Sequence, residues 1–295
     1  MRKTSVYLPE TLKRRLRARS EASGRSEAEL IRASIEAALE QSPTPSATAD
    51  PPVPGRLVGV GVGPGSPDLL TVRALAALRR ADRVLAPTTA SVAVGRAEQI
   101  VRQAAPDVAL DRVEFVMAAD HAARAGALGV ACDLVTAHLA AGEEVAFITL
   151  GDPNTYSTFG SVAAGVRARR PDTPVVTVPG IMAFQALATE AGVDLVDEEQ
   201  SLVLLAARAG DAEIDAALAD PTRTVVLYKG GARLGALADR LERAGRLDGA
   251  VLGELLGMNG ERVAAVADVR DRAASYLSSI IVPASDGAGP VPEPR

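Results

Sequence analysis

Residues 57–65, Leu-Val-Gly-Val-Gly-Val-Gly-Pro-Gly, and residues 145–158, Val-Ala-Phe-Ile-Thr-Leu-Gly-Asp-Pro-Asn-Thr-Tyr-Ser-Thr, each run from an apolar segment into a glycine turn. An unbroken apolar run is typical of a parallel strand that is buried on both faces. A glycine at the end of such a strand lets the backbone approach a ligand closely. The two stretches predict an α/β fold with ligand-facing turns, although each turn alone also suits a plain strand-to-helix connection.

A third turn of this kind, Pro179-Gly180, follows the strand-like run 175–178 and precedes a helical pattern. The carboxyl ends of parallel strands meet at one edge of a sheet, so the three turns are predicted to line one crevice. Further strand-like runs occur at 201–205, 224–228, 262–269 and 278–282. We expect two αβα lobes, residues 57–180 and 181–283.

The composition limits the class of protein. The chain has 295 residues, 47% of them hydrophobic and 3% aromatic, and a formal net charge of −5. No apolar run reaches the roughly 20 residues that cross a bilayer, so we expect a cytoplasmic protein without a membrane segment. Cys132 is the only cysteine and His121 and His138 are the only histidines, so we expect neither a disulfide nor a dedicated metal site.

Residues 1–40 form a separate, basic segment, with nine Lys or Arg against six Glu. Residues 3–8 alternate as a short strand does, and Pro9 opens a helix that ends near Gly24. Ser26 and Glu29 are spaced as a capping box that begins a second helix. Residues 41–56 contain five prolines and predict an extended linker, and residues 284–295 predict a disordered tail.

The basic segment resembles a ribbon-helix-helix DNA-binding domain over nearly all of residues 2–40. The resemblance implies a homodimer whose paired strands enter the major groove of double-stranded DNA. Lys3, Ser5 and Tyr7 would then face base edges, and the backbone amides near Ser26 would hold a phosphate. A module that dimerises without binding DNA is the alternative.

The larger body resembles the tetrapyrrole methylase family over residues 57–282, through the three turns together with Gly59 to Thr71. This resemblance implies the two-lobed fold of class III methyltransferases. Within the family, residues 151–159, 184–186 and 114–117 are similar to precorrin-2 C(20)-methyltransferases. S-adenosylmethionine is thereby implied as methyl donor, and precorrin-2 or cobalt-factor II as acceptor. Another corrin or uroporphyrinogen III methylase stays open, as does a regulator that senses a tetrapyrrole or S-adenosylmethionine.

The resemblance also implies site residues. The cofactor would contact Leu150, Gly151, Asp152, Thr155, Tyr156, Ser157, Thr158, Met182, Ala183 and Lys229. The tetrapyrrole trough would be bordered by Gly61, Gly63, Pro64 and Gly65. Asp152 also suits a plain helix-capping role. Because the acceptor carries carboxylates, basic residues should rim its trough, and the candidates are Arg83, Arg96, Arg208 and Arg233.

Two positions depart from the family pattern. Ser66 stands where many relatives have an aspartate, which leaves Asp68 as a weak candidate for proton handling and no firm catalytic base. Lys229 stands where relatives often have methionine. Its charge would face a sulfonium unless the side chain points away.

Overall fold

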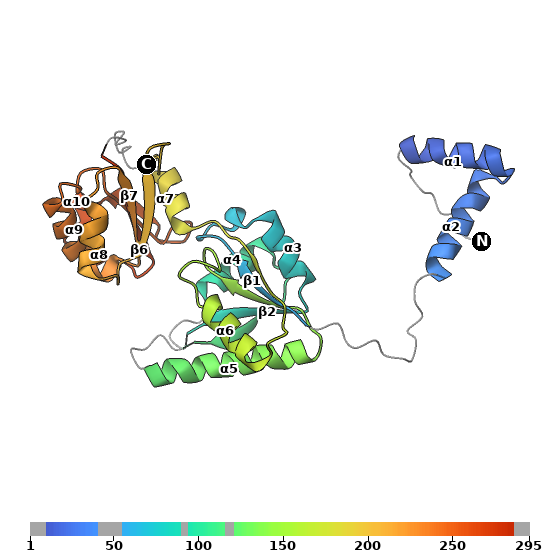
Figure 1. The fold of residues 1–295 in the computed structure, drawn as a ribbon, viewed down its shortest axis with the longest axis horizontal. Helices are drawn as coiled ribbons and strands as arrows, with labels where there is room; N and C mark the ends of the chain where they lie inside the picture. Colours follow the sequence, from blue (N-terminus) through green and yellow to red (C-terminus); the bar gives the residue numbers. More distant parts are fainter. Residues whose placement is uncertain (1–9, 41–54, 90–93, 116–120, 286–295) are drawn as a thin grey trace. The chain divides into compact units, whose positions relative to one another are not determined.

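The computed structural model describes residues 10–40, 55–89, 94–115 and 121–285. The chain divides into two compact units, Met1–Val53 and Pro54–Arg295 (Figure 1). The strand expected at residues 3–8 lies outside the described residues, as do Lys3, Ser5 and Tyr7.

The N-terminal unit contains two helices, α1 (Glu10–Ser23) and α2 (Glu27–Glu40). Gly24 adopts a φ of 69°, the left-handed conformation that ends many helices at glycine. The Ser26 N–H donates to the Glu29 carboxylate at 2.9 Å, and the Glu29 N–H donates back to Ser26 Oγ at 3.3 Å. This reciprocal pair confirms the predicted capping box.

The first sheet of the larger unit is entirely parallel, with strand order β3-β2-β4-β1-β5. Its strands are β1 (Leu57–Gly61), β2 (Arg83–Thr88), β3 (Asp111–Glu114), β4 (Val145–Thr149) and β5 (Val175–Val178). The helices of this region are α3 (Val72–Arg80), α4 (Arg96–Ala104), α5 (His121–Ala140) and α6 (Phe159–Arg169), with a short 3-10 helix η1 (Pro67–Leu69).

Helices cover both faces of this sheet, and the apolar pattern of β1 follows from that. Val58 and Val60 pack in one core with α3 and α4, whereas Leu57 packs in a second core with α5 and α6. Figure 1 shows α5 and α6 on one side of the strands. Every residue of β1 is buried, so alternation with polar residues would place a polar side chain in one of the two cores.

The second sheet is mixed, with strand order β6-β7-β10-β8-β9, and β10 runs antiparallel to both of its neighbours. Its strands are β6 (Ser201–Ala206), β7 (Arg223–Tyr228), β8 (Val251–Glu254), β9 (Arg262–Ala265) and β10 (Ser278–Val282). The accompanying helices are α7 (Ala183–Ala191), α8 (Asp211–Leu218), α9 (Leu234–Arg243), α10 (Val266–Val269) and the 3-10 helix η2 (Gly231–Arg233).

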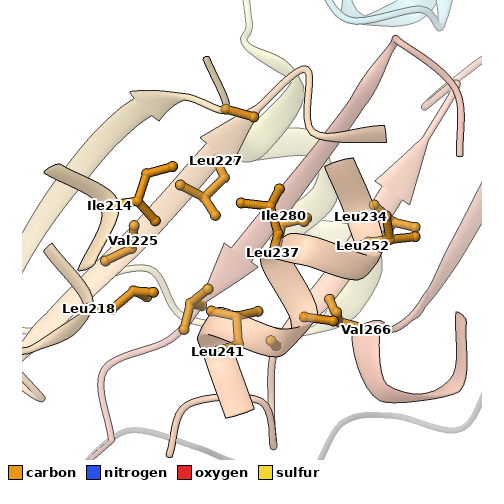
Figure 2. Packing of buried hydrophobic residues seen from close by; sticks show 14 of the residues in the cluster. Ile214, Leu218, Val225, Leu227, Leu234, Leu237, Leu241, Leu252, Val266 and Ile280 are labelled. Atoms are coloured by element: carbon orange, nitrogen blue, oxygen red, sulfur yellow. The ribbon is translucent and has the colours of Figure 1, made fainter. Parts of the chain in front are cut away.

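The two faces of the second sheet also have separate cores. Figure 2 shows Leu237 and Leu241 of α9 against Val225, Leu227 and Ile280 of the sheet. On the opposite face, α7 packs against β7, β8 and β10. The predicted α/β fold is confirmed, and each sheet lies between helices as an αβα arrangement requires.

Three local features differ from expectation. Only the first half of the predicted strand 262–269 is extended, since Val266–Val269 is helical. Gly55 and Arg56 are packed on the body, where Arg56 pairs with Glu144, although their sequence suggested linker. Ala284 is also buried, and its N–H donates to Thr224 Oγ1 at 3.0 Å.

Across the described ranges, no helix combines the length and apolarity needed to span a bilayer. The same residues include no group of three or more His, Cys, Asp or Glu side chains arranged to hold a metal ion. Cys132 lies buried in α5, and burial raises the pKa of its thiol.

Candidate functional site

One pocket of about 440 Å³ lies where the ends of strands from both sheets meet. The first sheet contributes the residues after β2 and β4, and the second sheet contributes the ends of β7 and β8 and the start of β10. Its size falls within the roughly 300–1,000 Å³ typical of small-molecule sites. The pocket therefore lies at the edge of the first sheet that the glycine turns predicted.

The three glycine turns meet behind this pocket through their backbones. A Cβ on Gly61 would lie 2.5 Å from the Gly151 carbonyl oxygen, and one on Gly180 would lie 2.1 Å from the same atom. The Gly151 N–H donates to the Gly63 carbonyl at 2.8 Å. Only glycine permits this approach, so the turns form one junction rather than three separate connections.

Asp152 ties the junction together. One carboxylate oxygen accepts the Asn154 N–H at 2.8 Å, and the other accepts the Gly180 N–H at 3.1 Å. The side chain thus links the turn after β4 to the turn after β5. The alternative that Asp152 caps the next helix is wrong, because α6 (Phe159–Arg169) has Thr158 at its N-cap, whereas Asp152 joins the two turns and lines the pocket.

Backbone strain is concentrated at the pocket. Among the described residues, three that are not glycine have φ in the left-handed region, namely Tyr156 (48°), Lys229 (61°) and Leu255 (52°). All three line the pocket. Such conformations persist where the surrounding structure holds them, and they cluster at ligand sites.

Tyr156 and Lys229 link the two sheets across the pocket. The Tyr156 hydroxyl donates to the Leu204 carbonyl of β6 at 3.1 Å, and Lys229 Nζ donates to the Tyr156 carbonyl at 3.2 Å. The Lys229 ammonium also lies 5.6 Å from the centre of the Tyr276 ring. The positive charge of Lys229 therefore lies against a backbone carbonyl and an aromatic ring.

Tyr228, the last residue of β7, also lines the pocket, next to Tyr156. Its ring lies 5.7 Å from the Tyr156 ring, and its hydroxyl accepts the Phe184 N–H at 3.4 Å. Burial raises the pKa of the Tyr228 phenol well above its ordinary value. Burial therefore favours the neutral form of the phenol, which can accept and donate hydrogen bonds.

The pocket brings together every residue predicted to contact a cofactor. Charged groups on its described wall are few, namely Asp152, Arg96 and Lys229. Lining residues predicted for the cofactor are Leu150, Gly151, Asp152, Thr155, Tyr156, Ser157, Thr158, Met182, Ala183 and Lys229. All ten residues therefore lie around one pocket, whichever molecule the pocket binds.

The residues predicted to border the tetrapyrrole divide differently. Pro64 lines the pocket, whereas Gly61, Gly63 and Gly65 are buried outside its lining. A Cβ on Gly65 would lie 1.9 Å from the Leu256 carbonyl, so this glycine faces protein backbone of the second sheet's loops. The structure thus gives these glycines a packing role that the sequence alone did not indicate.

Asp68 and three of the four candidate arginines lie away from the pocket lining. Asp68 is exposed in η1 and accepts a hydrogen bond from Ser66 Oγ. Arg83 and Arg233 are paired with carboxylates, and Arg208 is exposed elsewhere. Arg96 alone of the four lines the pocket.

Arg96 opens α4, beside a buried carboxylate. Its guanidinium donates to Met258 Sδ at 3.4 Å. Glu98, two residues later, is fully buried, which acts to raise its pKa, but hydrogen bonds from Arg112 and Arg102 hold that pKa below its usual value. Glu98 is therefore ionised and committed to its own arginines, which leaves Arg96 available to a ligand.

Sequence reasoning missed much of the pocket wall. The missed lining residues include Thr88, Gly95, Phe115, Tyr228, Gly253, Leu255, Met258, Tyr276, Ser278 and Ser279. Most follow or begin strands of ordinary composition. Strand ends were the one usable signal, and it did not indicate which strand ends meet.

Ser26 in the N-terminal unit was predicted to bind phosphate through nearby amides. Its own N–H is engaged by the Glu29 carboxylate. A phosphate at this helix start would therefore contact the following amides or displace Glu29.

Comparison with known proteins agrees with this geometry. Residues 56–269 match the family Tetrapyrrole (Corrin/Porphyrin) Methylases, and residues 2–42 match Ribbon-helix-helix protein, copG family. The chain is 34% identical over 238 residues to a precorrin-2 C(20)-methyltransferase of Sinorhizobium sp, covering 78% of this chain and 95% of that protein. It is also 34% identical over 233 residues to a cobalt-precorrin-2 C(20)-methyltransferase of Salmonella typhimurium, covering 77% of this chain and 96% of that protein.

Solved structures share the fold at lower sequence identity. A cobalt precorrin-4 methyltransferase superposes with a TM-score of 0.61 at 18% identity, covering 80% of this chain and 98% of that one. A uroporphyrin-III C-methyl transferase from Thermus thermophilus, complexed with S-adenyl homocysteine, superposes with a TM-score of 0.55 at 22% identity, covering 77% and 97%. The chain therefore belongs to the tetrapyrrole (corrin/porphyrin) methylase family and carries a ribbon-helix-helix domain at its N-terminus.

Proposed function

We propose that the unit Pro54–Arg295 is a methyltransferase that uses S-adenosylmethionine to methylate C(20) of precorrin-2 or of cobalt-factor II. The observation that carries this proposal is that one pocket gathers all ten residues assigned to the cofactor by resemblance. The two C(20)-methyltransferases, each matched over nearly its full length, support this substrate over other corrin precursors. Residues 57–180 and 181–283 would be the two lobes that enclose the reaction.

The pocket fits a nucleoside-sized cofactor on three observations. Its volume is about 440 Å³, and its described wall carries only three charged groups. Gly151 lines it with a φ of 69° and no atom within 4 Å of the position a Cβ would take. The backbone at Gly151 therefore presents an open, side-chain-free surface, on which the cofactor would lie between the 150–158 turn and Met182, Ala183 and Lys229.

The protein's contribution to the reaction is mainly positional. When bound, S-adenosylmethionine supplies a methyl group already activated by its sulfonium sulfur. Asp152 and the glycine junction hold the first wall of the pocket, and the Tyr156 and Lys229 contacts hold the second wall against it. Walls held together in this way would orient the cofactor toward the acceptor, so positioning by these residues would supply most of the catalysis. The transfer would break the sulfonium-methyl bond, release S-adenosylhomocysteine and leave one proton to be lost from the methylated carbon. Asp68 does not line the pocket, so we assign that proton to water.

Methyl transfer to a defined acceptor tests the proposal directly. Purified protein is incubated with methyl-labelled S-adenosylmethionine and either precorrin-2 or cobalt-factor II, and the tetrapyrrole is analysed by mass spectrometry. One added label at C(20) is expected, and the preferred acceptor identifies whether cobalt is already inserted. Transfer only to uroporphyrinogen III would instead identify a different member of the family.

Arg96 is expected to bind a carboxylate of the acceptor. Arg96→Ala removes the one guanidinium on the described pocket wall, so KM for the tetrapyrrole should rise about tenfold with little change in affinity for S-adenosylhomocysteine. Steady-state kinetics and calorimetry measure the two quantities. Arg208→Ala, at an exposed arginine outside the pocket, is the matched control and should leave both unchanged. An unchanged KM in Arg96→Ala would remove this residue from substrate binding.

We further propose that the N-terminal domain forms a homodimer and binds double-stranded DNA. Helix α1 has no buried residue, and Leu12 is 44% exposed, although α1 and α2 contact each other. A domain this small needs a second copy to bury its apolar side chains. Lys3, Ser5 and Tyr7 would then read base edges, with amides near Ser26 on a phosphate.

Two measurements test this second role. Sedimentation should give a dimer for the full chain and a weaker or absent dimer for a chain that lacks residues 1–53. Binding to double-stranded DNA from the region upstream of its own gene, followed by fluorescence anisotropy, should weaken steeply with salt because phosphate neutralisation releases counterions. If the anisotropy of the DNA does not change, or if its change does not depend on salt, the domain serves for dimerisation and not for DNA binding. DNA binding without any methyl transfer would favour a regulator that senses its ligand through the pocket.

A further inference from the structure

Tyr276, in the loop between α10 and β10, presents an exposed aromatic ring at the pocket. Tyr276 is 45% exposed and lines the pocket, so a bound molecule can reach its side chain. Of the other large apolar residues in the described ranges, Tyr156 is the one that is also both exposed and part of the lining. The Tyr156 hydroxyl donates to the Leu204 carbonyl, so Tyr156 joins the two sheets. Tyr276 makes no such link, and its ring calls for another explanation.

The backbone on either side of Tyr276 is anchored to the body. The Leu277 carbonyl accepts the Leu255 N–H at 3.1 Å, which ties the loop to the residue after β8. The loop also packs closely against η2, because a Cβ on Gly231 would lie 2.0 Å from the Ser275 carbonyl oxygen. An aromatic ring on an anchored backbone costs little entropy to order when a ligand covers it. The loop therefore presents the ring as a preformed surface.

Lys229 occupies one face of the Tyr276 ring. Its ammonium lies over the ring, 5.6 Å from the centroid, and donates to the Tyr156 carbonyl at 3.2 Å. A cation over one face of an aromatic ring draws the electron density of the ring toward that face. The opposite face then favours a flat, electron-rich partner over a second cation. The exposed part of Tyr276 therefore suits an electron-rich ring system.

We propose that Tyr276 stacks against the conjugated ring system of the tetrapyrrole acceptor, an inference that rests on the proposed function. A reduced tetrapyrrole is a broad and electron-rich ring system, which matches the open face of Tyr276. The adenine of the cofactor is the other flat ring in the reaction, and it is both smaller and poorer in electrons. Tyr276 is thus a binding residue for the acceptor, on the pocket wall that the second sheet contributes.

Two substitutions separate the ring from its hydroxyl. Tyr276→Leu keeps an apolar side chain but removes the aromatic face, so the Kd for the tetrapyrrole should rise about tenfold. Tyr276→Phe keeps the ring, so its Kd should stay close to that of the wild-type chain. Because Tyr276 is exposed, neither change should alter the melting temperature much. Val130→Ala, at an exposed apolar residue of α5 outside the pocket lining, is the matched control and should leave the Kd unchanged.

The experiment is titration of the full chain with precorrin-2 and with cobalt-factor II, followed by absorbance, and with S-adenosylhomocysteine, followed by calorimetry. Tyr276→Leu should weaken the tetrapyrrole and leave the affinity for S-adenosylhomocysteine unchanged. If S-adenosylhomocysteine is weakened as much as the tetrapyrrole, or alone, the assignment to the acceptor is overturned. Equal losses in the Leu and Phe variants would assign the effect to the hydroxyl and overturn stacking. Unchanged affinities would overturn the role of Tyr276. If the wild-type chain binds neither tetrapyrrole, the proposed function fails instead.

Discussion

Gly180→Ala is expected to slow methyl transfer about a hundredfold and to destabilise the larger unit. A Cβ at this position would lie 2.1 Å from the Gly151 carbonyl and 2.8 Å from Gly61, which are both backbone. Because backbone cannot rotate away as a side chain can, the turns after β1, β4 and β5 must separate. We expect the free energy of unfolding to fall by about 3 kcal/mol. The pocket wall would shift by a large fraction of an ångström, which lowers kcat/KM about a hundredfold.

Gly160→Ala is the control for this substitution. Gly160 is exposed in the first turn of α6, and no atom lies within 4 Å of its Cβ position. Alanine there should raise the free energy of unfolding by about 0.5 kcal/mol, because it favours the helix. Chemical denaturation and methyl-transfer rates measure both variants. A Gly180→Ala protein with normal stability and activity would show that the turns do not form a rigid junction.

Asp152→Ala should produce the second large effect. The change leaves the Gly180 and Asn154 N–H groups without their carboxylate partner. Losing both hydrogen bonds should lower the free energy of unfolding by about 2 kcal/mol. The 151–158 turn would no longer be tied to the turn after β5, so affinity for S-adenosylhomocysteine should fall about a hundredfold.

Asp220→Ala separates the general cost of losing a turn carboxylate from the specific effect on the pocket. Asp220 accepts the Thr222 N–H at 3.0 Å in the same local manner, but it does not line the pocket. Its replacement should lower the melting temperature and leave S-adenosylhomocysteine affinity unchanged. Equal affinity losses in the two aspartate variants would mean that Asp152 acts through overall stability alone.

The local elements that sequence reasoning predicted have local causes. The capping box at Ser26 and Glu29 and the glycine stop at Gly24 each depend on residues within one turn of helix. The buried strand β1 was evident because helices on both faces of a parallel sheet demand an unbroken apolar run. Strands β3 and β8 were not predicted, because each has only four residues, charged ones among them, and neither shows a long unbroken apolar run.

The pocket was only partly visible in the sequence. The ten cofactor residues were placed through family resemblance, and most of them adjoin a glycine turn. Arg96 was one of four arginines proposed to bind the acceptor's carboxylates, with nothing in the sequence to favour it. Only the tertiary structure shows that the start of α4, where Arg96 lies, reaches the pocket. Tyr276 carried no signal, because the exposure of its ring and the ammonium over it depend on how the loop before β10 packs.

By itself, the sequence determined the α/β class, the separate N-terminal domain and the three glycine turns, since each follows from the periodicity or backbone freedom of adjacent residues. Tertiary structure alone decided that β10 lies antiparallel between β7 and β8, and that the strained residues Tyr156, Lys229 and Leu255 surround one pocket. The physical reason is that these arrangements depend on contacts between residues far apart in the chain, 48 positions from Tyr156 to Leu204 and 73 from Tyr156 to Lys229, which no local pattern encodes.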